Sequence, residues 1–276
     1  MAFRIQSGSA AIAAQRYLGK SQRAVEQSLK KLASGSKTVN AGDDAAGFAI
    51  SESLRGQVRG LKQATQNAES ALSFIQTAEG GLNEQNNILI RLRELSVQSA
   101  SDTIGDQERE FIDKEFQQLV AEFDRIAQST RFGNKQLLIG SGEEFEFHIG
   151  ASKEKENIIK FKLDANTTAA EVGISGLSID DQDTARDILA DIDDALLNIA
   201  DARSTFGAVQ SRFHFAIDNL SVQTQNLEQA RSILTDVDVA EEVTNLTKNQ
   251  ILQDIGVSVL AQANASAERA LQLINY

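Results

Sequence analysis

Two histidines and two short acidic clusters are the side chains in this sequence whose types could bind a metal or transfer a proton. The 276 residues include no Cys, which excludes a disulfide framework, a thiolate nucleophile and a zinc–thiolate site. His148 lies in a segment that alternates polar and apolar residues, and His214 lies between two Phe residues. Neither has a base or nucleophile nearby in the sequence, so both are interpreted as packing or surface residues.

The acidic clusters are explained better as helix starts than as metal sites. They are Asp43-Asp44 and the group Asp236, Asp238, Glu241 and Glu242. Both lack the glycine and the ligand spacing of a calcium-binding loop. Asp is a favoured N-cap, and acids in a first turn complement the helix dipole. The sequence also has no phosphate loop, nucleophile elbow or dinucleotide fingerprint. We therefore predict no catalytic residue, no metal, no cofactor and no enzymatic activity.

Apolar residues recur at alternating intervals of three and four, which predicts long helices. Any site in this chain must therefore be positioned by such helices. Residues 188–234 keep this spacing for about six heptads, with Gln223 as the one polar member. A matching seam runs from Ile50 to Leu92, where Gln57 and Gln85 fill two slots. A shorter seam follows a break at Gly105. The absence of Pro, which breaks helix interiors, agrees with this pattern.

Each end of the chain carries its own amphipathic segment. Both segments have apolar stripes with roughly helical spacing. We predict that these stripes form a surface for assembly, which comprises Leu18, Val25, Leu29, Leu32, Leu252, Ile255, Val259 and Ala263. Residues 1–42 hold seven basic side chains and one acidic, a net charge of +6, whereas residues 235–276 hold six acidic and two basic, a net charge of −4. Opposite charges on two striped segments indicate that the two ends pair with each other.

The middle of the chain alone has the pattern of β-strands. Residues 143–149 and 159–163 alternate polar and apolar side chains around a polar, turn-like stretch, which predicts a β-hairpin. The expected fold is mainly α, a long antiparallel helical bundle or coiled coil with a small β-hairpin. Its predicted divisions are 1–42, a terminal helix and joint; 43–180, the first part of the rod with the hairpin; 181–234, the last rod helix; and 235–276, the second terminal helix.

The charge and hydropathy of the chain exclude several kinds of partner. A net charge of −12 argues against binding to nucleic acid, and no apolar run approaches the length of a membrane span. The first 20 residues lack the pattern of a cleaved secretory signal. We expect a protein that either stays in the cytoplasm or leaves by a route without signal cleavage.

Several motifs, in order along nearly the whole chain, closely resemble those of bacterial flagellins. The first half contains residues 28–35, 40–51, 76–82 and 91–98, and the second half contains 206–212, 236–241 and 262–264. The resemblance implies a minimal flagellin without large outer domains, whose subunits polymerise into the flagellar filament for swimming motility. It also implies that residues 1–42 and 235–276 form the filament core, where the terminal helices pair.

The same resemblance implies the location of the protein and its binding partners. The subunit would be secreted through the flagellar export apparatus, with an export chaperone on its C-terminal segment, and would reside in the extracellular filament. The filament cap and the hook-junction proteins would be further partners. A Toll-like receptor of animals reads a patch in this family, and Arg91, Leu95 and Glu115 occupy the matching positions, although Ile90 replaces the usual Gln.

Two alternative functions remain open at this point. A hook–filament junction protein shares the terminal segments and the helical rod, but the motif at residues 91–98 and the short middle favour flagellin. A cytosolic coiled-coil scaffold would show neither export nor filaments.

Overall fold

The chain forms two compact units. The terminal unit comprises Met1–Gln57 and Asn226–Tyr276, and the rod unit comprises Val58–Gln225. The computed structural model describes residues 9–274, with side-chain surroundings for residues 11–266. Residues 1–8 and 275–276 of the predicted terminal segments lie outside the described residues.

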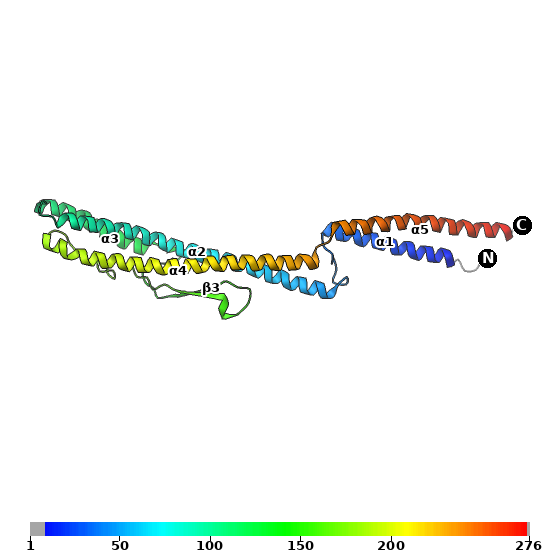
Figure 1. Cartoon of the computed structure of the whole chain (residues 1–276), viewed down its shortest axis with the longest axis horizontal. Coiled ribbons are helices and arrows are strands. Elements are labelled where there is room, and N and C mark those ends of the chain that lie inside the picture. The colour runs from blue at the N-terminus through cyan, green and yellow to red at the C-terminus, as the bar shows by residue number, and fades with distance from the viewer. Residues whose placement is uncertain (1–8, 275–276) are drawn as a thin grey trace. The chain divides into compact units, whose positions relative to one another are not determined.

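Five helices carry most of the described chain, and the predicted mainly α fold is confirmed. They are α1 (Ser9–Ser34), α2 (Ala45–Ser99), α3 (Asp106–Ser129), α4 (Gln182–Thr235) and α5 (Val239–Ile274), as Figure 1 shows. Between α3 and α4 lie β1 (Arg131–Phe132), β2 (Lys135–Gln136), β3 (Glu144–His148), a short 3-10 turn (Lys155–Asn157) and β4 (Ile158–Lys162). The rod helices extend up to about seven residues beyond the seams that predict them, whereas α5 begins 13 residues before Leu252, the first residue of the predicted stripe.

In the rod unit, α2 packs antiparallel to both α3 and α4. Arg93 of α2 pairs with Asp193 of α4 at 2.7 Å. Glu79, which precedes Arg93 in α2, accepts a hydrogen bond from Gln210, which follows Asp193 in α4. The predicted seams are the faces that meet: those on α2 and α4 are buried from Val58 to Leu95 and from Ile188 to Leu220. At the start of α2 the register differs from the prediction by one residue. Ser51 is buried there and Ile50 is exposed.

A cluster of aromatic rings joins the β-hairpin to the helices. Strands β3 and β4 pair antiparallel with Phe145 opposite Phe161, so the hairpin predicted from alternation is confirmed. The Phe74 ring of α2 lies 5.0 Å from that of Phe145, and the Phe147 ring lies 5.5 Å from Phe213 of α4. Because Phe side chains bury large areas, this hairpin supplies the third layer of the rod beyond the end of α3.

One polar side chain occupies the core of the rod unit. Gln85, which fills a seam slot of α2, is fully buried and donates hydrogen bonds to the carbonyl oxygens of Phe123 and Thr167, at 3.2 and 3.0 Å. It therefore ties α2 to α3 and to the segment after β4. A Leu in this slot would remove both hydrogen bonds and leave the carbonyl of Thr167 without the donor that Gln85 supplies.

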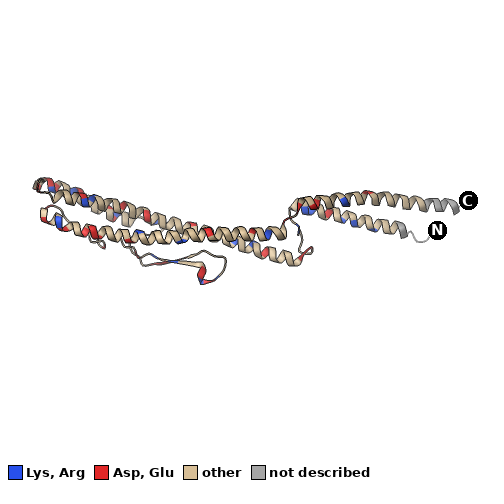
Figure 2. Ribbon diagram, viewed as in Figure 1, with Lys and Arg blue, Asp and Glu red and all other residues tan. Residues whose placement is uncertain are grey.

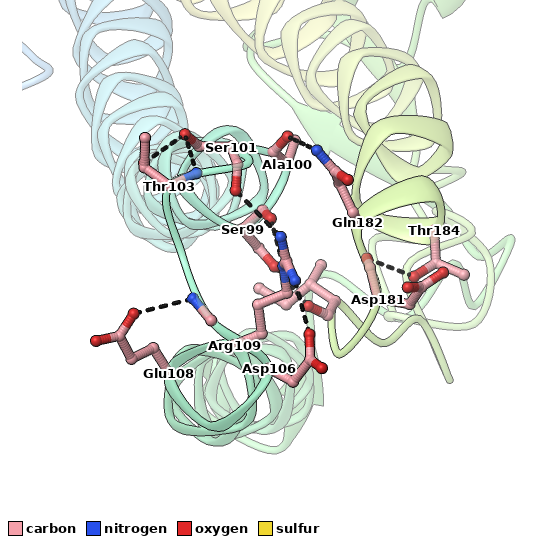
Figure 3. A network of polar contacts seen from close by, with 12 residues as sticks. Ser99, Ala100, Ser101, Thr103, Asp106, Glu108, Arg109, Asp181, Gln182 and Thr184 are labelled. Atoms are coloured by element: carbon pink, nitrogen blue, oxygen red, sulfur yellow. Dashed lines mark hydrogen bonds and ion pairs between the residues drawn. The ribbon is translucent and has the colours of Figure 1, made fainter.

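A buried arginine closes the turn between α2 and α3 (Figure 3). Arg109 donates to the carbonyl oxygens of Ser99 and Ser101 at 3.0 and 3.1 Å, and pairs with Asp106 at 3.0 Å. The last carbonyls of a helix have no partner within the helix, so this guanidinium caps α2. Gln182 of α4 donates to the next carbonyl, that of Ala100, at 3.1 Å.

We predict that Arg109→Met destabilises the free subunit by about 2–3 kcal/mol. The substitution keeps the aliphatic stem, but it removes the donors for buried carbonyl oxygens at the end of α2. Urea unfolding followed by circular dichroism measures the loss.

Arg125→Met provides the control for this prediction. Arg125 pairs with Glu122 at 2.6 Å, but both side chains are exposed, and such surface pairs contribute about 0–1 kcal/mol. Equal midpoints for the two variants would contradict a capping role for Arg109.

Candidate assembly surface

The two ends of the chain pair through α1 and α5, which lie side by side and antiparallel. Lys31 of α1 faces Glu242 of α5 at 3.8 Å, and Leu18 lies against Gly256 farther along both helices. Figure 2 shows basic residues along α1 and acidic residues at the start of α5. The predicted pairing of the two ends is therefore present within one subunit.

Small and polar residues form much of the seam between α1 and α5. The residues turned away from solvent on α1 are Ala11, Ala14, Leu18, Ser21, Val25, Ser28 and Leu32. Those on α5 are Glu242, Leu246, Asn249, Gln253, Gly256, Leu260 and Ala263. Both series alternate intervals of three and four. A Cβ at Gly256 would lie 3.4 Å from Cδ1 of Leu18, so the backbones approach closely here.

Part of the predicted apolar stripe on α1 lies in this seam. Leu18, Val25 and Leu32 are half-buried against α5, and so is Ala263 from the other side. Leu29, in contrast, is 50% exposed, because the neighbouring Ser28 takes the seam slot at 4% exposure. A serine fits the narrow gap between close helices better than the larger leucine.

The bulky residues of the predicted C-terminal stripe lie outside the seam. Leu252, Ile255 and Val259 are each about half exposed, and with Ala14 and Tyr17 they line a groove of about 480 Å³ between the two helices. In a single subunit this row of aliphatic side chains has only part of its surface covered.

Sequence reasoning did not find the small seam residues Ser21, Ser28 and Gly256. The prediction is based on the stripe with the largest apolar side chains. In α1 and α5 that stripe differs from the one that packs against the partner helix. The available signal is the spacing of Leu246, Leu260 and Ala263 around Gly256, which repeats by heptads.

Two backbone hydrogen bonds, called the clasp below, join the segment just after α1 to the junction of α4 and α5. The N–H of Lys37 donates to the carbonyl of Thr235 at 2.7 Å, and that of Val237 donates to the carbonyl of Gly35 at 3.1 Å. Asp236 sits in this clasp. Hydrogen bonds from the hydroxyls of Ser232, at 2.5 Å, and then of Thr235 lower the pKa of its carboxyl below the usual value. The carboxylate thus fixes the last turn of α4.

Both acidic clusters lie at the starts of helices, as predicted. Asp44 accepts a hydrogen bond from the backbone N–H of Gly47 at 3.0 Å at the start of α2. Asp238 accepts from Ala240 and Glu241 at 2.9 and 3.2 Å at the start of α5. Within residues 9–274, no group of three His, Asp or Glu side chains is placed to hold a metal ion. Nor is any helix of the described chain both long and apolar enough to cross a bilayer.

The three residues of the predicted receptor patch have different surroundings in the rod unit. Arg91 of α2 donates to Glu115 of α3 at 2.9 and 3.0 Å and to Glu94 at 3.0 Å, and hydrogen bonds to Glu115 and then Glu94 raise its pKa. Both Arg91 and Glu115 are about half exposed. Leu95 is buried at 1% exposure, so it supports the core beneath this pair and presents no surface to a partner.

Comparison with known proteins covers most of the chain. Residues 5–143 match the model of the bacterial flagellin N-terminal helical region, and residues 189–274 match that of the C-terminal helical region. A flagellar filament 30.7 kDa core protein of Treponema maltophilum is 39% identical over 95% of this chain and 96% of its own length. A flagellin of Halalkalibacterium halodurans is 38% identical over 96% and 97%.

Solved structures agree with the fold. The crystal structure of Bacillus cereus flagellin aligns with a TM-score of 0.51 at 27% identity, covering 60% of this chain and 94% of that one. A putative flagellar hook-associated protein of Vibrio parahaemolyticus aligns with a TM-score of 0.58 at 14% identity, over 70% and 99%. The second likeness concerns the fold alone. From the two family models and the full-length relatives, this chain belongs to the bacterial flagellin family.

Proposed function

We propose that this protein is a structural subunit of a flagellar filament and that it polymerises through its paired terminal helices. The observation that carries the proposal is the row of Leu252, Ile255 and Val259 on α5, which the partner helix α1 leaves half exposed. Burying apolar surface stabilises by about 25 cal/mol per Å², so neighbouring subunits gain by covering this row. Relatives named as filament core proteins support the same reading.

The chain is divided, in this proposal, into filament-core and rod segments. Residues 1–42 and 235–276 form the core helices and the joint, and residues 43–180 and 181–234 form the rod with its hairpin. The clasp between Lys37 and Thr235 lies where the core segments begin, which supports boundaries at these positions. The hairpin loop, residues 151–156, is exposed and would face solvent.

Membership of the family also suggests a route and a set of partners. The subunit would pass through the flagellar export apparatus, with an export chaperone on residues 235–276, and join an extracellular filament beneath its cap. Proteins of the hook junction would contact the first subunits. The role is structural and needs no catalytic residue. Full-length relatives named flagellin favour this role over that of a hook–filament junction protein.

An animal Toll-like receptor is a further proposed partner. Arg91 and Glu115 form an exposed pair on α2 and α3, where a partner could reach both side chains. Leu95 would act only by holding Arg91 in place, because its own side chain is covered.

We predict that Val259→Asp abolishes growth of filaments from seeds. A charge on the exposed row would have to lose its hydration when a neighbouring subunit covers it. Purified variant is added to seeds of wild-type filament, and the polymer is measured by sedimentation.

Lys30→Gln and Ser152→Ala are the controls for Val259→Asp. Lys30 is an exposed charge on α1, and a surface charge of this kind contributes at most about 0–1 kcal/mol through any ion pair. Ser152 lies in the exposed loop of the hairpin. Both should polymerise like wild type. Normal filaments from Val259→Asp would contradict an assembly role for this row. A wild-type chain that never polymerises would contradict the proposed function itself.

We predict that α1 and α5 exchange their amide hydrogens quickly in dilute free subunit and slowly in filaments. Their seam is largely small and polar, so it buries too little apolar surface to offset about 1–2 kcal/mol of ordering entropy per residue. Mass spectrometry of residues 11–34 and 239–266 measures this. Protection equal to that of the rod core around Leu89 in the free subunit would show that the pair is stable alone.

We predict that Arg91→Ala weakens activation of receptor-bearing cells by the free subunit, by about tenfold or more, because interface arginines often contribute 2 kcal/mol or more. Arg125→Ala, another exposed arginine in an ion pair, is the matched control. Equal potency of both variants and the wild type would remove Arg91 from the receptor site, and an inactive wild type would remove the receptor from the partners.

A further inference from the structure

The free edge of strand β4 is an open row of backbone groups in the rod unit. Among the described residues the sheet of β3 and β4 has only these two strands, so β4 is paired on one side alone. The N–H of Ile149 donates to the carbonyl of Asn157 at 2.7 Å, and antiparallel strands repeat such bonded pairs at every second residue. Counted from Asn157, the N–H and C=O groups of Lys160 and Lys162 therefore point away from β3.

A groove lies between this free edge and α4. Its volume is about 590 Å³, and Val172, Ala202 and Thr205 line it together with the free edge. The ring of Phe161 lies 5.4 Å from that of Phe206, and this contact holds β4 alongside the helix, as the hairpin beside α4 in Figure 1 shows. The free edge therefore has open space next to it instead of a packed neighbour.

An open strand edge beside a groove is suited to an extended peptide. A peptide that lies along the edge becomes an additional strand, and its main chain supplies the hydrogen bonds that the edge lacks. The five residues of β4, Ile158–Lys162, provide about 16 Å of edge. The outer edge of β3 is less open, because Asn67 of α2 donates to the carbonyl of His148 at 3.1 Å.

The charges on the exposed face of the hairpin indicate which strand the free edge would accept. Lys160 pairs with Glu146 of β3 at 2.6 Å and with Glu144 at 3.5 Å, and side chains on neighbouring strands interact most strongly when they are directly opposite. A second copy of β4 would place lysine against lysine, which disfavours that pairing. A strand with acidic residues at alternate positions would place them beside Lys160 and Lys162, as β3 does on the other side.

The side chains between those acids would point into the groove. Its lining includes the apolar residues Val172, Ala202 and Phe206, which favour small apolar side chains there. Asp201 and Glu171 also line the groove, so an acidic side chain that points inward would be repelled. The groove and the free edge together therefore select for alternation, with acids outward and apolar residues inward.

We infer that the free edge of β4 binds an extended segment of another protein as a third strand of the hairpin, and that this segment alternates acidic and small apolar residues. The binding needs only the free subunit, so it is independent of polymerisation. It adds to the proposed function a contact that neither terminal helix takes part in.

The first test measures binding of a fluorescent peptide, Thr-Glu-Val-Glu-Val-Glu-Thr, to the full-length free subunit. The matched peptide with Lys in place of Glu should bind at least about tenfold more weakly. Two further peptides carry N-methyl groups either on every Glu or on every Val. An added strand donates only one of these two sets of amides to β4, so one methylated peptide should lose binding by about tenfold or more and the other should keep it within about twofold. Preference for the Lys peptide, or binding that survives both methylations, overturns the inference.

The second test follows amide hydrogen exchange of individual residues by nuclear magnetic resonance. Lys160 and Lys162 should exchange quickly in the free subunit and at least about tenfold more slowly with the Glu peptide bound. Ile159 and Phe161, whose amides face β3, should be protected in both states and serve as internal controls. Unchanged exchange at Lys160 and Lys162 with saturating peptide overturns strand addition. Protection of both that grows with protein concentration alone would assign the edge to a second copy of the chain and also overturns it.

The third test fills the groove from the helix side. Thr205→Tyr places a bulky uncharged side chain in the groove, and Ser204→Tyr places the same side chain about 100° around α4, on an exposed residue that does not line it. Peptide binding should weaken by about tenfold or more for Thr205→Tyr and by less than about twofold for Ser204→Tyr, with unchanged melting of both subunits by circular dichroism. Equal affinity of the two variants contradicts the groove as the binding site. None of these failures affects the filament role, and a wild-type chain that does not polymerise would leave peptide binding intact.

Discussion

Two helices packed against each other can each bury only one stripe, and the structure depends on this constraint. A third element is needed to cover the remaining apolar faces. In the rod unit α3 and then the β-hairpin provide it, so Phe74 and Phe213 are enclosed by rings from the hairpin. The α1–α5 pair has no third element among the described residues. Its surplus aliphatic side chains therefore remain at the surface.

The choice of residues in the α1–α5 seam follows from the same constraint. If Leu252, Ile255 and Val259 filled the seam, the pair would be more stable alone and would offer less to a neighbour. Placing Gly256 and Ser28 in the seam brings the helices close and turns the larger side chains outward. The arrangement exchanges stability of the single subunit for apolar surface that another molecule can cover.

The sequence predicts the rod better than the terminal pair, and the reason is physical. In α4, and in α2 from Leu61 onward, the seam residues are mostly Leu, Ile, Phe and Ala over many turns, so bulk and burial coincide and the register is unambiguous. In α1 and α5 the bulkiest stripe and the buried stripe are different, which is why Leu29 is exposed and Ser28 is not. The caps at Asp44 and Asp238 were predictable because they depend on local backbone geometry. The bonds made by Arg109 and Gln85 depend on residues far along the chain, and no spacing rule reveals them.

The clasp at the base of the terminal pair sets an order of folding. Its hydrogen bonds join Lys37 to Thr235 and Val237 to Gly35, residues roughly 200 positions apart, and closing so long a loop has a large entropic cost. Formation of the rod unit first brings α2 and α4 side by side and removes most of that cost. A chain that is synthesised from its N-terminus cannot complete the clasp until Thr235 and Val237 have been made. The closure cost therefore favours formation of the rod unit before the pairing of α1 and α5, and a chain that ends before α5 lacks the paired surface altogether.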